Sequence, residues 1–396
     1  MQKIILPLAI SFFTFQQIAF LVDVYQEKIV DVTFSTYFLF VTFFPQLIAG
    51  PIVHYKHLIP QFKDQTKFKA DFNNLSLGAV IFVLGLFKKV VIADGISEYA
   101  NPVFSAAAHG THLDFLEAWG GALSYTFQLY FDFSGYSDMA IGLGRMFGIK
   151  IPLNFNSPYK SPNIIQFWRR WHITLSVFLR DYLYIPLGGS RKGKLKRYTN
   201  LMITMILGGL WHGAGWTFII WGSLHGVFLV INHTWQALLK FPEKTWQSHW
   251  AYIKFSQLLT FICVVFAWVY FRSSDFHSAH HMIKAMIGLN GINIPEDLKS
   301  WKLITLLNQY FAINYVQESL FHRHVLRWFA FAGAICFFLP NPSEFLADYH
   351  PAFEKILSSS KIRWRFNALF GFFITIIFCI SVIYVTRKSE FLYFQF

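Results

Sequence analysis

Three short motifs within residues 167–216 decide the fold and function that we expect for this chain. They are FWRRWHITLS at residues 167–176, RDYLYIPLGG at residues 180–189 and GGLWHGAGW at residues 208–216. Two histidines, His172 and His212, lie among these tryptophans, arginines and glycines in an otherwise apolar chain. An ionisable side chain at bilayer depth costs about 2.5–3.5 kcal/mol or more. Such positions call for a function, and proton transfer is the first to consider.

The composition indicates a membrane protein. Of the 396 residues, 55% are hydrophobic, 20% aromatic and only 14% charged, whereas soluble domains carry about 25% charged residues. A soluble fold of this size would have to bury more apolar surface than a domain normally can. We therefore predict an all-α, multi-pass integral membrane protein, because helices satisfy their own backbone within lipid. Residues 1–396 are expected to form one domain.

The net charge of +13 does not indicate nucleic-acid binding, because no recognisable nucleic-acid module accompanies it. The basic residues lie in short clusters between apolar runs, such as RKGKLKR at residues 191–197. This pattern is typical of cytoplasmic loops that orient a membrane protein and contact anionic lipid. Cys263, Cys336 and Cys379 lie in apolar runs without metal-ligand spacing and are expected to act as small hydrophobic residues.

Apolar runs of near-spanning length lie at residues 4–22, 33–53, 76–94, 257–271, 326–339 and 368–386. Residues 116–147 are also apolar but contain Asp132 and Asp138. Two acids in such a run predict a broken or re-entrant segment, with a structural hydrogen-bonding role favoured for the acids. Residues 164–186 are expected to be helical, and residues 198–232 to form two helices or one kinked helix.

His212 is the strongest candidate for chemistry, because a neutral imidazole can take a proton from a hydroxyl at physiological pH. The alternative is a role in helix packing, since Gly209 and Gly213 form a small-residue contact pattern. The residues alone favour neither catalysis nor packing for His212. If its segment is helical, His172 shares a face with Arg169 and Ser176. Arg169 and Arg170 could then hold a phosphate of a thioester donor, or they mark the membrane edge. His225 is interpreted as structural.

Several catalytic classes lack support. The chain contains no phosphate-binding glycine loop, no His-Glu-x-x-His, no Cys-x-x-Cys and no Gly-x-Ser-x-Gly elbow. Metal, nucleotide-hydrolysis and serine-hydrolase chemistry are therefore not expected. The remaining catalytic class uses a base that activates a bound hydroxyl for direct attack.

The three motifs resemble those of the membrane-bound O-acyltransferase family. PQLIAGP at residues 45–51, YFDFSGYSD at 130–138 and NFNSPY at 154–159 are similar to that family as well, and the match is densest at residues 125–235. The most similar branch is the bacterial one that contains the membrane subunit of alginate O-acetyltransferase and the D-alanyl transferase of teichoic acids. Relatives usually have further membrane helices before LPLAISFFTF at residues 6–15, so the N-terminus is expected to be shortened.

The resemblance implies a helical membrane core with broken or re-entrant helices around a central tunnel. It also implies an acyl donor from the cytoplasmic side and an exported or cell-envelope glycan such as alginate as acceptor. His212 falls on the family's catalytic histidine and His172 on its second site. Further candidates for donor or substrate binding are Arg169, Arg180, Trp171, Ser176, Trp211 and Asp138.

These expectations predict acyl transfer, most simply of acetyl, in the inner membrane. No bound cofactor or metal is expected; acetyl-CoA or an acylated carrier would be the co-substrate. Expected partners are membrane lipid, the polysaccharide, periplasmic acetyltransferase-like subunits and an acyl carrier protein. The alternatives are D-alanyl transfer to teichoic acid, a proton-coupled transporter and an inactive family member.

Overall fold

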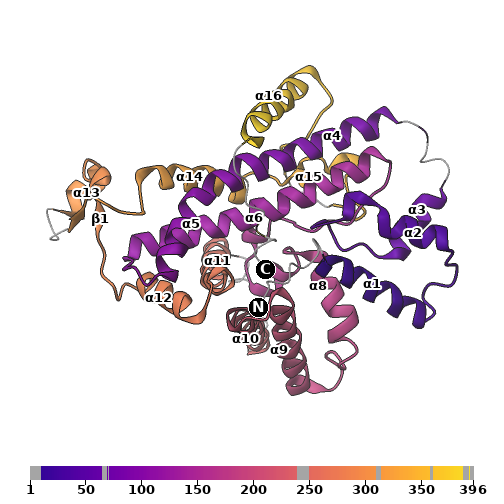
Figure 1. Cartoon of the computed structure of the whole chain (residues 1–396), viewed down its shortest axis with the longest axis horizontal. Coiled ribbons are helices and arrows are strands. Elements are labelled where there is room, and N and C mark those ends of the chain that lie inside the picture. The colour runs from indigo at the N-terminus through magenta and orange to yellow at the C-terminus, as the bar shows by residue number, and fades with distance from the viewer. Residues whose placement is uncertain are drawn as a thin grey trace, which may run out of the picture.

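The described part of the chain is built from helices and one short pair of strands (Figure 1). The computed structural model describes residues 10–64, 69, 71–238, 249–308, 314–356, 360–386 and 392. The α-helices are α1 (Ile10–Tyr25), α2 (Phe34–Thr42), α3 (Tyr55–Lys63), α4 (Phe72–Phe87), α5 (Asp94–Ala108), α6 (Phe115–Met146), α7 (Ile164–Trp168), α8 (Ile173–Leu179), α9 (Gly193–His212), α10 (Trp216–Leu238), α11 (Trp250–Arg272), α12 (Phe276–Met286), α13 (Lys302–Leu307), α14 (Arg323–Phe337), α15 (Pro342–Phe345) and α16 (Ala368–Val385).

Short 3₁₀ and π-helical turns join or extend these helices. They are η1 (Phe44–Gln46), η3 (Lys88–Ala93), η4 (Pro158–Lys160), η5 (Arg180–Tyr184), η6 (Glu296–Leu298) and η7 (Ala347–Tyr349). Strands β1 (Ile294–Pro295) and β2 (Tyr315–Val316) pair in parallel. The predicted helical fold is confirmed.

Helix α6 is the core of the bundle, and 22 of its 32 residues are buried. It begins at a capping box, in which Asp114 accepts the backbone N–H of Glu117 and Glu117 accepts that of Asp114. This arrangement satisfies two donors that a helix start otherwise leaves open. Helices α4, α5, α11, α12 and α14 all contact α6.

Two pairs of glycines bring the backbones of α4 and α6 together. Gly85 faces Gly135, and a Cβ added to Gly85 would lie 2.6 Å from the carbonyl oxygen of Gly135. Gly78 faces Gly142 in the same way. The two glycines of each helix are seven residues apart, which is about two turns, so one face of each helix makes both close approaches. Small residues are typical of such helix contacts in membranes.

Asp132 and Asp138 of α6 are paired with lysines of η3. Lys88 Nζ lies 2.7 Å from Asp138 Oδ2, and Lys89 Nζ lies 2.7 Å from Asp132 Oδ1. The predicted break in residues 116–147 is therefore wrong, because α6 is continuous. Each buried carboxylate has a cationic partner, so the helix does not have to unwind to bring it to water.

The helix predicted for residues 164–186 is interrupted. Helix α7 ends at Trp168, and α8 begins only at Ile173. His172 precedes α8 in the left-handed backbone conformation, with φ of 41°. Arg169, His172 and Ser176 consequently do not share one continuous helical face, contrary to the interpretation that depended on an unbroken helix.

Residues 198–232 form two helices, as one of the predicted alternatives has it. Helices α9 and α10 make an antiparallel hairpin, in which Gly209 lies against Phe218 and Gly226 lies against Met202. The chain reverses at residues 213–215. The hairpin places His212 at its tip.

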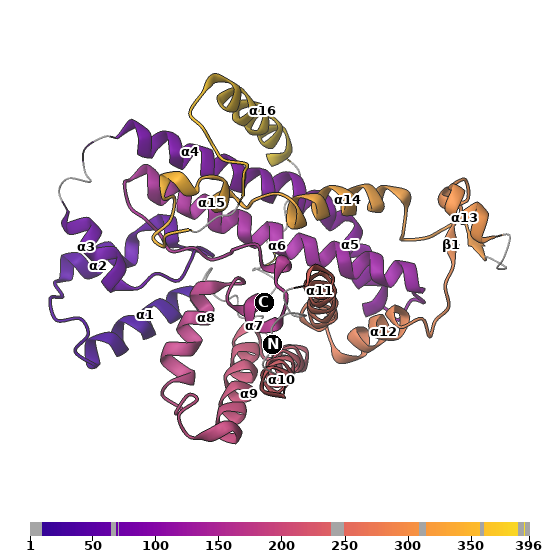
Figure 2. The ribbon, with the colours of Figure 1, turned by 180° about the vertical axis from the view of Figure 1, so that it is seen from behind.

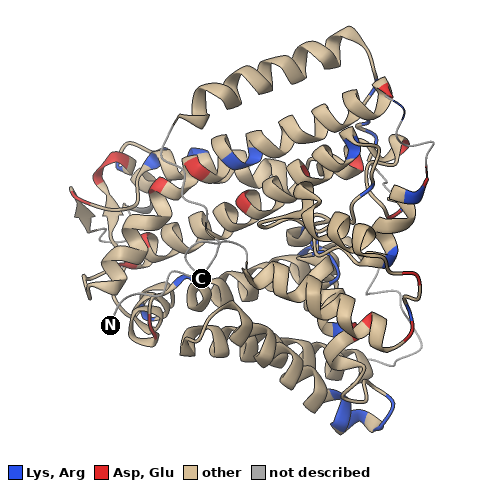
Figure 3. Cartoon of the chain, turned by 45° about the vertical axis from the view of Figure 1, so that its right-hand side comes forward, with Lys and Arg blue, Asp and Glu red and all other residues tan. Residues whose placement is uncertain are grey.

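Three helical stretches of the described chain are long and apolar enough to cross a membrane, namely Phe72–Ala108, α11 and α16. The first of these runs continuously through α4, η3 and α5. Figures 1 and 2 show α16 at the edge of the molecule beside α4. Figure 3 shows long helices with few charged residues and a basic group where α9 begins. These features fit a protein that lies in a membrane.

Candidate active site

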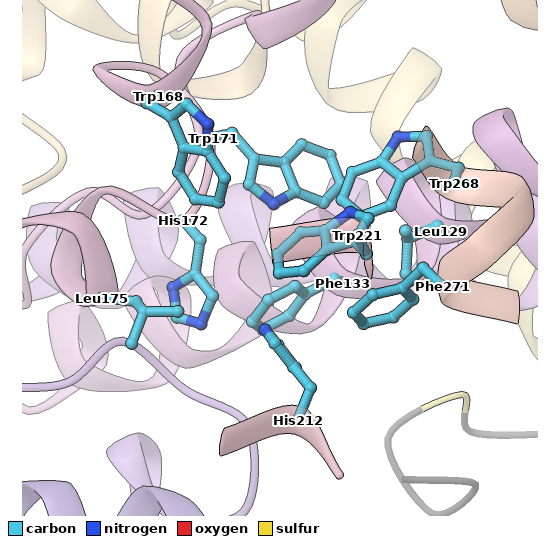
Figure 4. Close-up of a pocket in the computed structure, with 10 residues that line it drawn as sticks. All are labelled: Leu129, Phe133, Trp168, Trp171, His172, Leu175, His212, Trp221, Trp268 and Phe271. Atoms are coloured by element: carbon cyan, nitrogen blue, oxygen red, sulfur yellow. The ribbon is translucent and has the colours of Figure 1, made fainter. Parts of the chain in front are cut away.

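A small cavity brings the two predicted histidines together where α6 to α11 meet (Figure 4). Its open volume is about 20 Å³, which is room for one water molecule. The residues that line it are Leu129, Phe133, Trp168, Trp171, His172, Leu175, His212, Trp221, Trp268 and Phe271. The central tunnel implied by the family resemblance stays a prediction.

His212 is the last residue of α9, and aromatic side chains cover its ring. The ring centroids of Trp221 and Phe271 lie 5.2 and 4.9 Å from that of His212. Only 8% of His212 is exposed. Gly213 follows directly, and a Cβ at that position would lie 2.5 Å from the ring of Phe218. The glycines therefore serve helix packing while His212 faces the cavity, so the two readings of this motif are compatible.

His172 reaches the same cavity from the turn between α7 and α8. Its Nδ1 lies 3.1 Å from Oδ1 of Asn154. Among the residues that the structure describes, Nε2 has no hydrogen-bond partner, although only 2% of His172 is exposed. The ring of Phe133 packs edge-on against the imidazole at 4.7 Å between centroids. A buried nitrogen left open toward a cavity is suited to take up a substrate proton.

Three other predicted residues lie at or near the wall of the cavity. Trp171 lines it directly. The Ser176 hydroxyl donates to the carbonyl oxygen of Trp171 at 3.4 Å. Trp211 stacks on Phe15 of α1, with 4.6 Å between ring centroids. Ser176 and Trp211 thus support the wall without lining the cavity.

The remaining predicted residues are not part of the cavity lining. Arg169 is exposed at the end of α7. Arg180 is exposed and pairs with Asp181 at 2.6 Å. Asp138 forms the buried ion pair with Lys88, which fits the structural role favoured for it. Binding of a donor or substrate by these three residues stays a prediction.

The cavity has an aromatic wall that was not predicted from the sequence, formed by Trp168, Trp221, Trp268 and Phe271. Trp268 and Phe271 are three residues apart on α11, a spacing that places them on one helical face. This spacing is the sequence pattern that could have indicated this part of the wall. His225 supports the same wall, because its Nδ1 accepts a hydrogen bond from Trp168 Nε1 at 3.3 Å. His225 itself does not line the cavity.

The cavity lining offers two imidazoles in apolar surroundings. It contains no carboxylate, ammonium, hydroxyl or thiol side chain, so the lining itself has no acidic group or serine or cysteine nucleophile. Within the described ranges, no three His, Cys, Asp or Glu side chains are grouped to hold a metal ion. Proton transfer to or from a bound substrate is the chemistry that these side chains can perform.

Comparison with known proteins finds bacterial acyltransferases among the relatives of this chain. The peptidoglycan O-acetyltransferase of Helicobacter pylori is 50% identical over 317 residues, which are 74% of this chain and 58% of that protein. The probable alginate O-acetylase of Pseudomonas putida is 42% identical over 331 residues, covering 81% of this chain and 64% of the relative. The teichoic acid D-alanyltransferase of Bacillus subtilis is 30% identical over 289 residues, 69% of this chain and 70% of that protein.

The chain spans about three fifths of the length of the first two of these relatives. The profile of the membrane-bound O-acyltransferase family matches residues 1–273. That match includes both histidines and every element that lines the cavity. The chain therefore belongs to the membrane-bound O-acyltransferase family.

Proposed function

We propose that the chain is an O-acyltransferase that moves an acetyl group onto hydroxyls of an exported or cell-envelope polysaccharide. The observation that carries this proposal is the meeting of His172 and His212 at one buried, apolar cavity. Relatives named for O-acetylation of peptidoglycan and alginate support this class of acceptor. Peptidoglycan is the first acceptor to test, since the relative named for it is 50% identical.

The reaction needs one proton acceptor at the acceptor hydroxyl. His212 takes that proton as the predicted base, while the hydroxyl oxygen attacks the carbonyl carbon of the acyl donor. The new ester C–O bond forms as the C–S bond of a thioester donor breaks, and the leaving thiolate receives the proton. His172 positions a substrate or assists the proton transfer. A positioned base contributes about 10²–10⁴-fold in rate.

The cavity favours acetyl over D-alanyl transfer. A D-alanyl group is larger and carries an ammonium, which would need an anionic partner when buried. None of the ten lining residues is acidic. The similarity to teichoic acid D-alanyltransferases makes D-alanyl transfer the second candidate.

The donor side is assigned to the cytoplasmic face. Arg169, Arg180 and the basic residues 191–197 are exposed or partly exposed, and guanidinium groups bind phosphates well. Acetyl-CoA or an acylated carrier protein would supply the acyl group. Periplasmic acetyltransferase-like subunits are the proposed partners, and the inner membrane is the proposed location.

Ester-linked acetate on the polysaccharides of the source strain tests this function. Peptidoglycan and secreted glycan are analysed by NMR in the native strain, a deletion strain and a strain with His212→Ala, with membrane protein levels matched. Loss of acetate in both mutants is expected. Acetate that persists with His212→Ala but not in the deletion would show that the base is assigned wrongly. Unchanged acetate in all three strains would refute polysaccharide acetylation.

A further inference from the structure

The side-chain oxygen of Asn154 is identified by what surrounds it. Oδ1 lies 3.2 Å from the backbone nitrogen of Thr174, which can only donate. The atom that accepts this bond must be the amide oxygen and not the amide nitrogen. On the opposite side, Nδ2 donates to the hydroxyl of Ser137 at 3.3 Å, a partner that can accept from it. Asn154 is fully buried, so water does not compete for this oxygen.

The hydroxyl of Thr174 also donates to this oxygen. Its Oγ1 accepts the backbone N–H of Ile52 at 3.0 Å, which leaves its own proton for Asn154 Oδ1 at 2.9 Å. Asn154 Oδ1 therefore acts as an acceptor toward every neighbour. His172 Nδ1, 3.1 Å away, must carry a proton to bond to it.

A neutral imidazole has one N–H and one lone pair. With the proton on Nδ1, the lone pair lies on Nε2, the nitrogen that faces the cavity without a partner among the described residues. We propose that Asn154 is a positioning residue that holds His172 in the Nδ1–H tautomer, so that Nε2 is a proton acceptor directed into the cavity. The catalytic consequence of this proposal rests on the proposed function.

Asn154 also fixes the backbone at His172. Its carbonyl oxygen accepts the N–H of Ile173 at 2.9 Å, while its side chain accepts the N–H of Thr174. These bonds follow directly after a histidine in the left-handed conformation, which costs a non-glycine residue of the order of 1 kcal/mol or more. One asparagine thus sets both the direction of the ring and its tautomer.

An uncharged amide such as Asn154 is better suited than a carboxylate to hold His172 as a neutral imidazole. The rings of Phe12, Phe133 and Phe155 pack against His172. An amide oxygen orients the imidazole without favouring imidazolium, so Nε2 keeps its lone pair. An aspartate at position 154 would instead stabilise the charged ring.

The tautomer is observable without any assay of activity. Full-length protein labelled with ¹⁵N-histidine is reconstituted into lipid bilayers, and solid-state NMR records the two ring nitrogens of His172, assigned by their loss in His172→Gln. A protonated Nδ1 and an unprotonated Nε2 are expected in the native chain. A protonated Nε2 with a bare Nδ1 would overturn the proposal, whatever the enzyme does.

Variants separate positioning from folding. Asn154→Leu is expected to remove the fixed tautomer and to lower kcat by about 100-fold with KM within a few-fold. Asn154→Asp keeps an acceptor for Nδ1–H but also favours the charged ring, so its kcat should lie between that of the native chain and that of Asn154→Leu. The matched control is Asn156→Leu in the same loop, where the amide oxygen binds Asn341 instead; the His172 signals should not change.

The kinetic and spectroscopic results are independent. If Asn154→Leu changes the His172 signals while the chain transfers no acetyl group to any tested glycan, the positioning role stands and the proposed function fails. If Asn154→Leu leaves both signals as in the native chain, the positioning role is refuted. Equal kcat for Asn154→Leu and Asn154→Asp would refute its catalytic consequence.

Discussion

Both histidines of the site lie at breaks in helices and not on their faces. His172 precedes α8, and His212 ends α9. A side chain at a helix end is less restricted by neighbouring turns, so the two rings can approach one cavity from different directions. This also explains why helical spacing around His172 misassigned Arg169 and Ser176 to its face. The motifs identified the histidines, but the conformation of His172 depends on Asn154, 18 positions earlier.

The lining of the cavity should set the length of the acyl group. Leu129 of α6 is 3% exposed and lines the cavity, so Leu129→Ala adds space beside the histidines. We expect the ratio of kcat/KM for a propionyl donor to that for an acetyl donor to rise on the order of tenfold, because one methylene in such a pocket is worth about 10–200-fold. Purified protein with thioester donors and an oligosaccharide acceptor provides the measurement.

A matched control separates this effect from simple loss of packing. Leu77→Ala removes an equally buried leucine, 2% exposed, from α4 away from the cavity. Both variants should lose about 2–5 kcal/mol of stability, but Leu77→Ala should leave the propionyl-to-acetyl ratio unchanged. A raised ratio in both variants would mean that the cavity does not select the acyl group.

At the scale of elements, the contact between α4 and α6 depends on glycine. A Cβ at Gly85 would meet the backbone of α6, which cannot turn aside as a side chain can. Gly85→Ala should therefore destabilise the chain by about 1–3 kcal/mol, in spite of the better helix propensity of alanine. Thermal unfolding in detergent, followed by size-exclusion chromatography, measures the loss.

Gly371 of α16 is the control for this prediction. A Cβ there would have no heavy atom within 4 Å apart from its own helix and chain neighbours, so Gly371→Ala should be neutral or slightly stabilising. Equal stability of the two variants would contradict the role assigned to the glycine contact.

The ion pair between Lys88 and Asp138 predicts that the losses of stability from substituting each residue are not additive. Lys88→Met leaves Asp138 buried without its cation, and this should cost about 3–5 kcal/mol. The double variant with Lys88→Met and Asp138→Leu removes both charges and should regain most of that loss. A double-mutant cycle on thermal unfolding measures the coupling, and additive losses would show that the pair does not stabilise the bundle.

These pairs also show what the sequence could not reveal. The helical class and most of the helices were predictable from apolar runs, and the α9–α10 hairpin from its glycines. The continuity of α6 was not, because Lys88 is 50 positions before Asp138 and only the packing of α4 on α6 joins them. The aromatic wall was missed for the same reason, since α7, α10 and α11 each contribute a part of it.

At the scale of the whole molecule, the α9–α10 hairpin indicates how deep in the membrane His212 lies. The first turns of α9 are basic, and its apolar part covers the 11 residues 201–211. At 1.5 Å per residue this part is about 16 Å long, roughly half of a 30 Å hydrocarbon core. His212 would then lie near mid-depth, and the chain reverses directly after it. A site at that depth lets a donor and an acceptor meet from opposite faces.

For a donor to reach this depth from the cytoplasm, the start of α9 must be cytoplasmic. Residues 191–197 contain five basic residues and no acid, and lysines and arginines in short loops favour the cytoplasmic side. In a chain whose three cysteines are replaced by alanine, Lys194→Cys should react with an impermeant maleimide in inside-out vesicles but not in intact cells. Detergent permeabilisation gives the full labelling level as the control. Labelling in intact cells would place the basic end of α9 outside, and the donor would then have to reach His212 from the face opposite to the one proposed.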